Sequence, residues 1–421
     1  MYNVRTTKSR EFAVKKFNVT GLCIKEKHYM ADISGVLSEI MKMVDEDCYF
    51  AINRGGQFGK TITLFYAEKA MVGSGYICIS ISFEGADYGM FESSAAFCQG
   101  FLWRVHNALA YAAPECAPLW LDEGILSFDQ LSGLITKLCR GKKVALMIDE
   151  VDAASNNHVF LNFLAMLRNK FLARERPHHD TFHSVILAGI YDIKNIKLKM
   201  VSEGKAELKP KERQFNSPWN IAADFDVDMA FSPEEISAML MQYEEDFRAG
   251  MDIEAVAEEI YDYTSGHPFL VSRICKYVDE KLGKDWSTFG VRDAVRIILQ
   301  ERNTLFDDLA KNLDSFKNLH DFLHSILMRG AKRGFMLYDE DVNLAATFGY
   351  VKKEKNKAVV SNKIFEILMC DYFVSKDEKA ESLKPPAGRG LYYEITSSGS
   401  FNMELCLRKQ VGGKMIFDVV V

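Results

Sequence analysis

One stretch, residues 48–71, constrains the fold of this chain more than any other. It opens with a short apolar run of strand type, Cys48–Ile52, passes through the loop RGGQFGKT at residues 54–61, and ends in an apolar helical pattern. A loop that wraps a phosphate needs bare backbone N–H groups, and the helix that follows brings its positive end to the anion. In such a loop Lys60 meets the β- and γ-phosphates of a nucleotide and Thr61 holds Mg²⁺.

The loop departs from the usual pattern at one position, because Arg54 stands where the first glycine is expected. The chain has four other Gly-Lys pairs, and none of them is followed by Ser or Thr. The alternative interpretation is an ordinary loop and helix start with an exposed lysine, so a second signal has to decide. The candidate nucleotide contacts in the loop and the first helical turn are Arg54, Gly55, Gly56, Gln57, Phe58, Gly59, Lys60, Thr61 and Ile62.

The second signal is the run KVALMIDE at residues 143–150. A near-continuous apolar run that ends in two acids is typical of a central parallel strand that delivers carboxylates to its carboxyl end. Asp149 is the candidate that orients the Mg²⁺ shell, and Glu150 is the candidate that accepts a proton from the attacking water. Taken alone, the run is also consistent with a solvated acidic turn. Because strands and helices alternate between the two signals, together they predict a P-loop nucleotide-binding domain.

The chain between and after these signals continues the alternation. Further strands are expected at Tyr76–Phe83, Ser184–Gly189 and Asn220–Val227, and helices at Phe91–Ala112, Phe128–Leu138 and Val159–Phe171. We therefore expect an α/β fold with a doubly wound parallel sheet that carries its ligand groups at the carboxyl ends of the strands. Tyr191 and Asp192 lie just past one strand end, where a polar residue senses the γ-phosphate; a solvated turn is the alternative.

An all-α region is expected directly after the sheet domain. Ser232 as N-cap and Pro233 as the first helical residue mark a sharp helix start, and helices follow at Ile253–Tyr263 and Phe269–Leu282. The triplet Gly266-His267-Pro268 between them is explained by a glycine cap and a proline helix start. Its place after the sheet domain favours a helical lid over the adenine, with Pro268 as a nucleotide contact and Tyr29 as a weaker candidate.

Residues from about 315 to 375 have a different pattern. Helices at Leu319–Met328 and Asp339–Thr347, a two-stranded turn at 349–361 and a closing helix at Lys363–Phe373 predict a winged-helix-like domain. The wing is basic, but the candidate recognition helix begins with Asp339, Glu340 and Asp341 at the end that would meet DNA. This acidic start favours a packing module over a DNA reader.

Composition limits the partners and the compartment. The 421 residues suffice for about two to four domains, and the net charge of −6 gives no general attraction to nucleic acid. Nine scattered cysteines without a Cys-x-x-Cys pair argue against structural zinc and a disulfide framework. No apolar run reaches the ~18 residues of a membrane span, and the N-terminus lacks a signal-peptide core. We expect a cytoplasmic protein with no membrane association.

Short strings along residues 16–410 add a resemblance. They are FNVTG (17–21), HYM (28–30), the Arg54-x-x-Gln57-x-Gly59-Lys60-Thr61 loop, ISFEG (81–85), IDEVD (148–152), ILAGIYDIKN (186–195), NSPWN (216–220), FSPEEI (231–236), TSGHPFLVS (264–272) and SNKIFE (361–366). With these strings the chain resembles a group of bacterial AAA-like P-loop ATPases related to the STAND signalling ATPases. The group's loop also tends to carry Arg at the first glycine position, and the Gly266–Pro268 triplet is similar to the STAND lid motif.

The resemblance also concerns the C-terminal region. Members of the group commonly continue into a PD-(D/E)XK nuclease-like domain, and NMELCLRK at residues 402–409 resembles its lead-in. The expected domains are a lead-in at 1–35, a P-loop ATPase core at 36–230, a helical lid at 231–304, a winged-helix-like domain at 305–375, and a linker with a truncated nuclease-like start at 376–421. A helix is expected to begin at Asn402–Leu407, and nuclease activity is not expected.

The expected function is ATP binding with Mg²⁺-dependent hydrolysis or an ATP-driven switch. Lys60 and Glu150 are the catalytic candidates, and Thr61 and Asp149 are the metal-ligand candidates. Arg168 and Arg174 are candidates for an arginine finger, with surface charge as the alternative. Two other functions stay open: a non-hydrolysing, nucleotide-regulated scaffold that a protein partner or a second copy reads, and a regulator that contacts nucleic acid through the basic wing.

Overall fold

The structure is a computed structural model that describes residues 14–121, 124–154, 157–190, 219–382, 406–411 and 414–419. The chain divides into two compact units, Met1–Leu368 and Met369–Val421. Tyr191, Asp192 and the lysine-rich segment 194–213 lie outside the described residues. None of the helices within these ranges is both long enough and apolar enough to span a bilayer.

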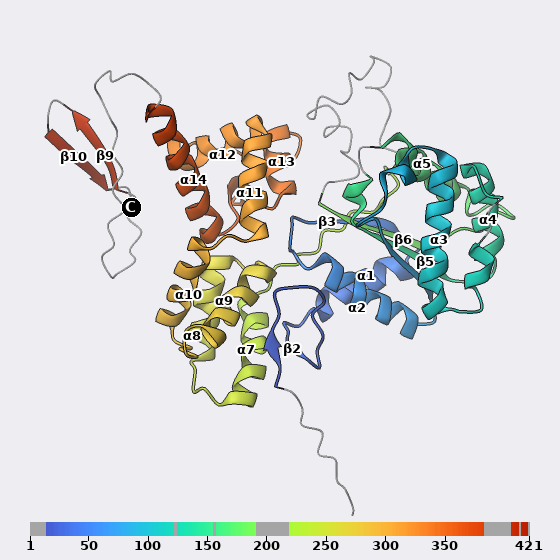
Figure 1. Cartoon of the computed structure of the whole chain (residues 1–421), viewed down its shortest axis with the longest axis horizontal. Helices are drawn as coiled ribbons and strands as arrows, with labels where there is room; N and C mark the ends of the chain where they lie inside the picture. The colour runs from blue at the N-terminus through green and yellow to red at the C-terminus, as the bar shows by residue number, and fades with distance from the viewer. Residues whose placement is uncertain are drawn as a thin grey trace, which may run out of the picture. The chain divides into compact units, whose positions relative to one another are not determined.

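A four-stranded parallel sheet organises the first unit (Figure 1). Its strands are β3 (Tyr49–Asn53), β6 (Ser184–Gly189), β5 (Val144–Asp149) and β4 (Ile77–Ser82), in that spatial order. The register pairs Asn53 with Gly189 and Ser82 with Asp149, so all four strands end at one edge. The predicted α/β fold with a parallel sheet is confirmed, and the loop and the acids that follow these strands are brought to the same edge.

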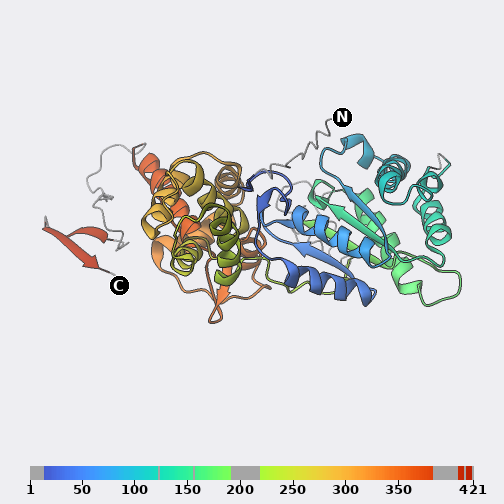
Figure 2. The same ribbon diagram turned by 90° about the horizontal axis from the view of Figure 1, so that it is seen from below.

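Helices cover both faces of this sheet, as Figure 1 and the quarter-turned view in Figure 2 show. Successive side chains of β5 alternate between two cores: Ala145 and Met147 pack with α1 (Ser34–Asp45) and α2 (Lys60–Gly73), whereas Leu146 and Ile148 belong to the larger core on the opposite face. The helices of that face are α3 (Ser94–Ala112), α4 (Phe128–Cys139) and α5 (His158–Ala173). The sheet is therefore doubly wound, as expected.

Three short 3₁₀ helices connect these elements. They are η1 (Tyr88–Phe91), η2 (Ala117–Trp120) and η3 (Val151–Ala153). The expected helix at Phe91–Ala112 thus begins later, at Ser94, because Ser93 is its N-cap and accepts a hydrogen bond from the amide of Ala96.

The expected fifth strand at Asn220–Val227 is not formed. The described part of this segment makes one isolated parallel bridge, between Ala223 and Phe50, next to β3. Farther along, the guanidinium of Arg54 donates to the carbonyl oxygen of Val227. A side chain therefore takes an acceptor that a continuing strand ladder would have used, and the segment runs beside β3 without joining the sheet.

A bundle of four helices follows the sheet region. They are α7 (Pro233–Phe247), α8 (Ile253–Thr264), α9 (Pro268–Glu280) and α10 (Thr288–Gln300). Ser232 and Glu235 form the predicted capping box at the start of α7. The helices expected at Ile253–Tyr263 and Phe269–Leu282 are confirmed to within two residues at each end.

The N-terminal strands β1 (Lys16–Phe17) and β2 (His28–Tyr29) pair in parallel and are attached to this bundle. The ring of Phe17 stacks on Tyr243 of α7 at 5.5 Å, and the Tyr29 hydroxyl donates to Asp246 at 2.8 Å. On the other side the Tyr66 hydroxyl of α2 donates to the Cys23 carbonyl at 3.1 Å. The N-terminal segment therefore joins the bundle to the helix that follows the phosphate loop.

Residues 304–362 form a further part of the first unit, which we call the helical module. It contains α11 (Thr304–Ser315), α12 (Lys317–Arg329), α13 (Glu340–Thr347) and the antiparallel pair β7 (Val351–Glu354) and β8 (Lys357–Val360). Helices α12 and α13 and the hairpin lie where the sequence predicts them, whereas α11 was not predicted. The helix α14 spans Lys363–Ser382.

The second unit contains an antiparallel pair, β9 (Cys406–Val411) and β10 (Lys414–Val419). The expectation of a helix over Asn402–Leu407 is therefore wrong for Cys406 and Leu407, which begin β9. In the sequence, alternating residues on either side of the Gly412-Gly413 pair favour a hairpin over a helix at this position.

The close approach at Gly266 leads to a stability prediction. Gly266 has a φ of 74°, and a Cβ there would lie 2.0 Å from the carbonyl oxygen of Phe231. We expect Gly266→Ala to lower the free energy of unfolding by about 2–5 kcal/mol, because the left-handed backbone and the clash both oppose a side chain. Gly330 is the matched control: its φ is 64°, but no atom lies within 4 Å of its Cβ position. Gly330→Ala should cost only about 1–2 kcal/mol in denaturant unfolding, and equal costs would contradict the packing argument.

Candidate functional site

The phosphate loop begins after β3 and ends in helix α2. Gln57 and Gly59 take positive φ values of 59° and 79°, and α2 begins at Lys60. The Lys60 ammonium folds back over the loop and donates to the carbonyl oxygens of Arg54 at 3.0 Å and Gly55 at 3.2 Å. Burial lowers the pKa of Lys60, while Glu150, Asp152 and Asp149 act in the opposite direction. The lysine is therefore held inside the loop amid carboxylates.

The hydroxyl that follows this lysine meets the first acid of β5. Thr61 Oγ1 donates to Asp149 Oδ2 at 2.7 Å, although 88 residues separate them in the chain. Asp149 is 8% exposed, so its carboxylate is nearly enclosed. A threonine hydroxyl, one or two carboxylates and the phosphates of a substrate are the oxygen ligands that Mg²⁺ takes in proteins. The two predicted metal ligands thus lie together in a suitable arrangement.

No cluster of three or more His, Cys, Asp or Glu side chains that could hold a metal occurs in the described part of the chain. A magnesium ion at Thr61 and Asp149 would therefore take its remaining oxygens from nucleotide phosphates and water. This is the usual way in which proteins bind Mg²⁺ with a nucleotide, since the ion keeps several waters and needs few protein ligands. The residues present fit that ion.

Glu150 is held in an unusual backbone conformation beside this pair. Its φ is 51° and its ψ 44°, a left-handed conformation that costs a residue other than glycine of the order of 1–3 kcal/mol. Its amide donates to Asp149 Oδ1 at 2.9 Å. Burial raises the pKa of the Glu150 carboxyl, and Lys60 opposes that rise. The strained turn places a second carboxylate, with raised proton affinity, next to the candidate metal ligand.

A third acid, Asp152, closes the same edge of the sheet and was not singled out from the sequence. Its carboxylate accepts the amide hydrogen of Ile190, just after β6, and lies 2.9 Å from where a Cβ on Gly189 would be. The carbonyl of Gly189 in turn accepts from the amide of Arg54 at 3.2 Å. Asp152 thereby joins the ends of β5 and β6 to the start of the loop. The sequence signal that could have identified Asp152 is its position as the last residue of the string IDEVD (148–152).

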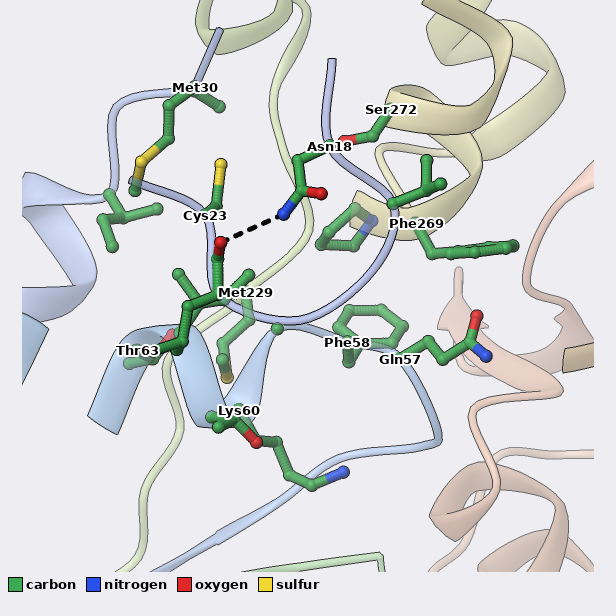
Figure 3. Close-up of a pocket in the computed structure, with 18 of the residues that line it drawn as sticks. Asn18, Cys23, Met30, Gln57, Phe58, Lys60, Thr63, Met229, Phe269 and Ser272 are labelled. Atoms are coloured by element: carbon green, nitrogen blue, oxygen red, sulfur yellow. Dashed lines mark hydrogen bonds between the residues drawn. The ribbon is translucent and has the colours of Figure 1, made fainter. Parts of the chain in front are cut away.

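A cavity of about 540 Å³ opens at the loop (Figure 3). Its phosphate-side wall contains the loop and the first turn of α2, together with Glu84 and Glu150. Among the candidate nucleotide contacts, those that line it are Gln57, Phe58, Gly59, Lys60, Thr61, Ile62 and Pro268. Arg54, Gly55, Gly56 and Asp149 are not among its lining residues. The volume lies within the usual range for sites that enclose a small ligand.

The opposite wall of the cavity comes from the N-terminal segment and the helical bundle. Asn18, Cys23 and Met30 of the N-terminal segment and Phe269 of α9 lie above Lys60 in Figure 3, and Met229 also lines the cavity. From the sequence, residues 1–35 are expected to be a lead-in, in which only Tyr29 is a candidate contact to the adenine. Tyr29 does line the cavity, but its hydroxyl is bonded to Asp246. The strings FNVTG and HYM were the signals for this wall, and their role depends on packing between distant segments.

The Arg54 side chain contacts neighbouring parts of the protein and does not point into the cavity. Its guanidinium donates to the carbonyls of Asn53 and Val227 and lies 5.9 Å from the centre of the Phe225 ring. Burial lowers its pKa. The side chain is therefore directed toward the segment beside β3, and only its carbonyl reaches Lys60.

The two arginine-finger candidates lie on α5 and make other contacts. Arg168 donates to the side chain of Asn220 at 2.7 Å, and Arg174 donates to the Asp47 carbonyl at 2.7 Å. Asp47 precedes β3, whereas Lys60 follows it, and a five-residue strand spans about 17 Å. Arg174 therefore lies at the opposite edge of the sheet from Lys60, where it cannot act on phosphates of the same molecule.

The basic wing also occupies a defined place in the first unit. Lys352, Lys353, Lys355 and Lys357 are exposed on β7, β8 and their turn. As the sequence indicated, α13 begins with acids: Asp339 caps its first amides, and Arg333 pairs with Asp339 at 3.2 Å. Lys352 donates to the Ser265 hydroxyl at 2.9 Å, so one wing lysine contacts the helical bundle.

Comparison with known proteins supports the fold. No protein-family model and no curated protein matches the sequence. The Walker-type ATPase PABY2304 of Pyrococcus abyssi is similar in structure, with a TM-score of 0.56 and 12% identity over 84% of this chain and 99% of that chain. The ORC2 protein of Aeropyrum pernix in ADPNP–ADP complexes has a TM-score of 0.41 and 14% identity, covering 82% and 94%. The RuvB branch migration motor of Thermotoga maritima has 0.37 and 12%, covering 85% and 96%. At this identity the likeness to PABY2304 concerns the fold, which is that of a P-loop ATPase.

The buried His267, next to the cavity-lining Pro268, is expected to make the stability of the protein depend on pH. Its imidazole is 3% exposed, and burial lowers its pKa from 6.5 to about 3. Below pH 6.5 the unfolded chain binds a proton that the folded protein excludes, so stability is lost as the pH falls from 6.5 toward 3. At pH 5 the loss is about 2 kcal/mol relative to pH 7.5. We expect His267→Phe to remove this part of the pH dependence in urea unfolding measured at both pH values; parallel curves for the two proteins would contradict it.

Proposed function

We propose that the chain binds ATP with Mg²⁺ and hydrolyses it, and that the hydrolysis changes its conformation. The observation that carries this proposal is that Lys60 and Thr61 line a cavity of about 540 Å³ while the Thr61 hydroxyl donates to Asp149 behind it. A lysine at a helix start, a hydroxyl beside it and an acid from a neighbouring parallel strand are the groups that phosphoryl transfer on this fold requires. The resemblance to AAA-like and STAND-related ATPases agrees with it.

Each group has a role that follows from its position. The amides of the loop and the ammonium of Lys60 hold the phosphates, and Thr61 and Asp149 would hold a magnesium ion, which would offset the negative charge of the phosphoryl group. Glu150 accepts a proton from the attacking water, because its raised pKa brings it nearer to the working pH. The wall built by residues 18–31, Met229 and Phe269 takes the base, since it is largely apolar.

The first test is Lys60→Ala. A hydrogen bond from a charged donor contributes about 1.5–3 kcal/mol, so affinity for ATP–Mg²⁺ should fall by about 10- to 100-fold in calorimetry. Lys69→Ala is the matched control, because Lys69 lies on the same helix, is exposed and does not line the cavity. Unchanged affinity in the Lys60 variant would remove the phosphate-binding assignment.

The second test separates hydrolysis from binding. Glu150→Gln keeps the shape of the side chain but cannot accept the proton, so phosphate release should fall by about 10²- to 10⁴-fold while ATP affinity stays within about threefold. Equal turnover would take Glu150 out of its role. The rival function, a non-hydrolysing scaffold whose nucleotide state a protein partner reads, is favoured if the unchanged protein releases no more phosphate than the Lys60→Ala variant.

A further inference from the structure

The outer side of the phosphate loop is covered by the helical module. A Cβ built on Gly55 would lie 2.5 Å from the carbonyl oxygen of Phe348 and 3.5 Å from the amide nitrogen of Gly349. Phe348 ends α13 as its C-cap. Only a glycine lets the loop backbone approach the module backbone this closely. The requirement for glycine at position 55 therefore comes from the module, on the side of the loop that faces away from the cavity.

A second contact joins the loop to the start of α11. The Gln57 amide donates to the hydroxyl of Thr304, the first residue of that helix. Gln57 is the loop residue other than glycine with a positive φ, and its side chain points away from Lys60 toward the pale orange ribbon of the module in Figure 3. The hydrogen bond thus holds the least favourable backbone conformation of the loop from outside.

A third contact passes through His267. Its ring meets Phe58 of the loop edge to face at 4.6 Å and Phe365 at 5.7 Å, and Phe365 meets Tyr350 of the module at 5.8 Å. The imidazole is buried and neutral, and its Nδ1 has no hydrogen-bond partner among the described residues. It therefore serves as an aromatic spacer between the loop and the module.

The loop is thus held from both sides, and Gly55 is contacted on each of them. On the inner side Lys60 donates to the carbonyls of Arg54 and Gly55; on the outer side Phe348 touches Gly55 and Thr304 holds Gln57. If Lys60 turns to phosphates, as the proposed function requires, it releases those carbonyls, and the outer contacts then keep the loop in place.

We propose that Thr304, Phe348 and His267 are positioning residues of the nucleotide site, and that seating of the helical module and loading of the loop with nucleotide favour each other. This inference rests on the proposed ATP binding. Because such coupling is reciprocal, a seated module raises nucleotide affinity and bound nucleotide stabilises the seated module. Couplings of this kind typically change affinity by about 5- to 150-fold.

Gly55→Ala is the sharpest test, because the three atoms nearest to the added methyl all belong to the module. Gly56→Ala adds the same methyl to the same loop where no atom lies within 4 Å, and neither glycine has a positive φ. It therefore reports what a methyl in the loop does to binding by itself. We expect Gly55→Ala to bind ATP–Mg²⁺ at least about fivefold more weakly than Gly56→Ala, and amide hydrogens of residues 304–316 and 345–350 to exchange faster only in Gly55→Ala.

Thr304→Val tests the same coupling from the module side, should Gly55→Ala not fold. Valine keeps the shape of threonine but removes the hydroxyl that accepts from Gln57, whereas Thr304→Ser keeps the hydroxyl and should restore both readouts. In the unchanged protein ATP–Mg²⁺ should slow exchange in both segments, and this slowing should be absent in Lys60→Ala.

The outcomes separate this inference from the proposed function. If the unchanged protein binds ATP–Mg²⁺ but Gly55→Ala and Thr304→Val match their paired variants in affinity and exchange, the coupling is overturned and ATP binding stands. Faster exchange of the module without a change in affinity overturns the coupling as well, because reciprocity requires both. If the unchanged protein binds no nucleotide, the proposed function falls and takes the coupling with it.

Discussion

The hydrogen bond between Thr61 and Asp149 fixes the geometry on which the functional interpretation of this structure depends. It joins the first turn of α2 to the end of β5 at 2.7 Å. Helix α2 follows β3, and β3 is not adjacent to β5, because β6 lies between them in the sheet. The contact therefore depends on the other hydrogen bonds at the carboxyl ends of the strands. There the Arg54 amide donates to the Gly189 carbonyl, and the Ile190 amide donates to the Asp152 carboxylate. Small shifts in any of these strand ends would separate the hydroxyl from the carboxylate.

Much of this edge could be predicted from the sequence because its signals are local. Lys60 and Thr61 follow a strand within a short loop, and Asp149 and Glu150 end an apolar run; parallel strands then bring such groups to one edge by topology alone. The strand expected at Asn220–Val227 shows where local patterns fail. Whether a segment joins the sheet depends on its partners, and here Arg54 takes the Val227 carbonyl while only Ala223 bridges to Phe50.

The cavity wall opposite the loop could not be placed from sequence for a related reason. Asn18, Cys23 and Met30 lie in a segment with little regular structure, whose position is set by Phe17 against Tyr243 and by the Tyr66 hydroxyl. Each of these contacts spans tens to hundreds of residues. The same holds for Thr304 and Phe348, because nothing in their local sequence indicates that they reach the loop. The groups proposed for phosphate chemistry are specified locally, whereas those that enclose the cavity are specified by tertiary packing.

The charges around Lys60 explain why the loop needs support from outside. Three carboxylates, those of Asp149, Glu150 and Asp152, act on the buried ammonium of Lys60. The phosphates of the proposed nucleotide would add further negative charge to this enclosed site, so we expect them to enter only with a divalent cation that offsets the repulsion. Without them, Lys60 donates to the loop's own carbonyls, and turning its ammonium toward phosphates would leave those carbonyls without that partner. If the Lys60 hydrogen bonds were the loop's main support, the loop could change shape when Lys60 turns to the phosphates. At that point its amides have to stay aligned to bind them. Contacts on Gly55, Gln57 and Phe58 from the other side are independent of Lys60, and they preserve the alignment that binding requires.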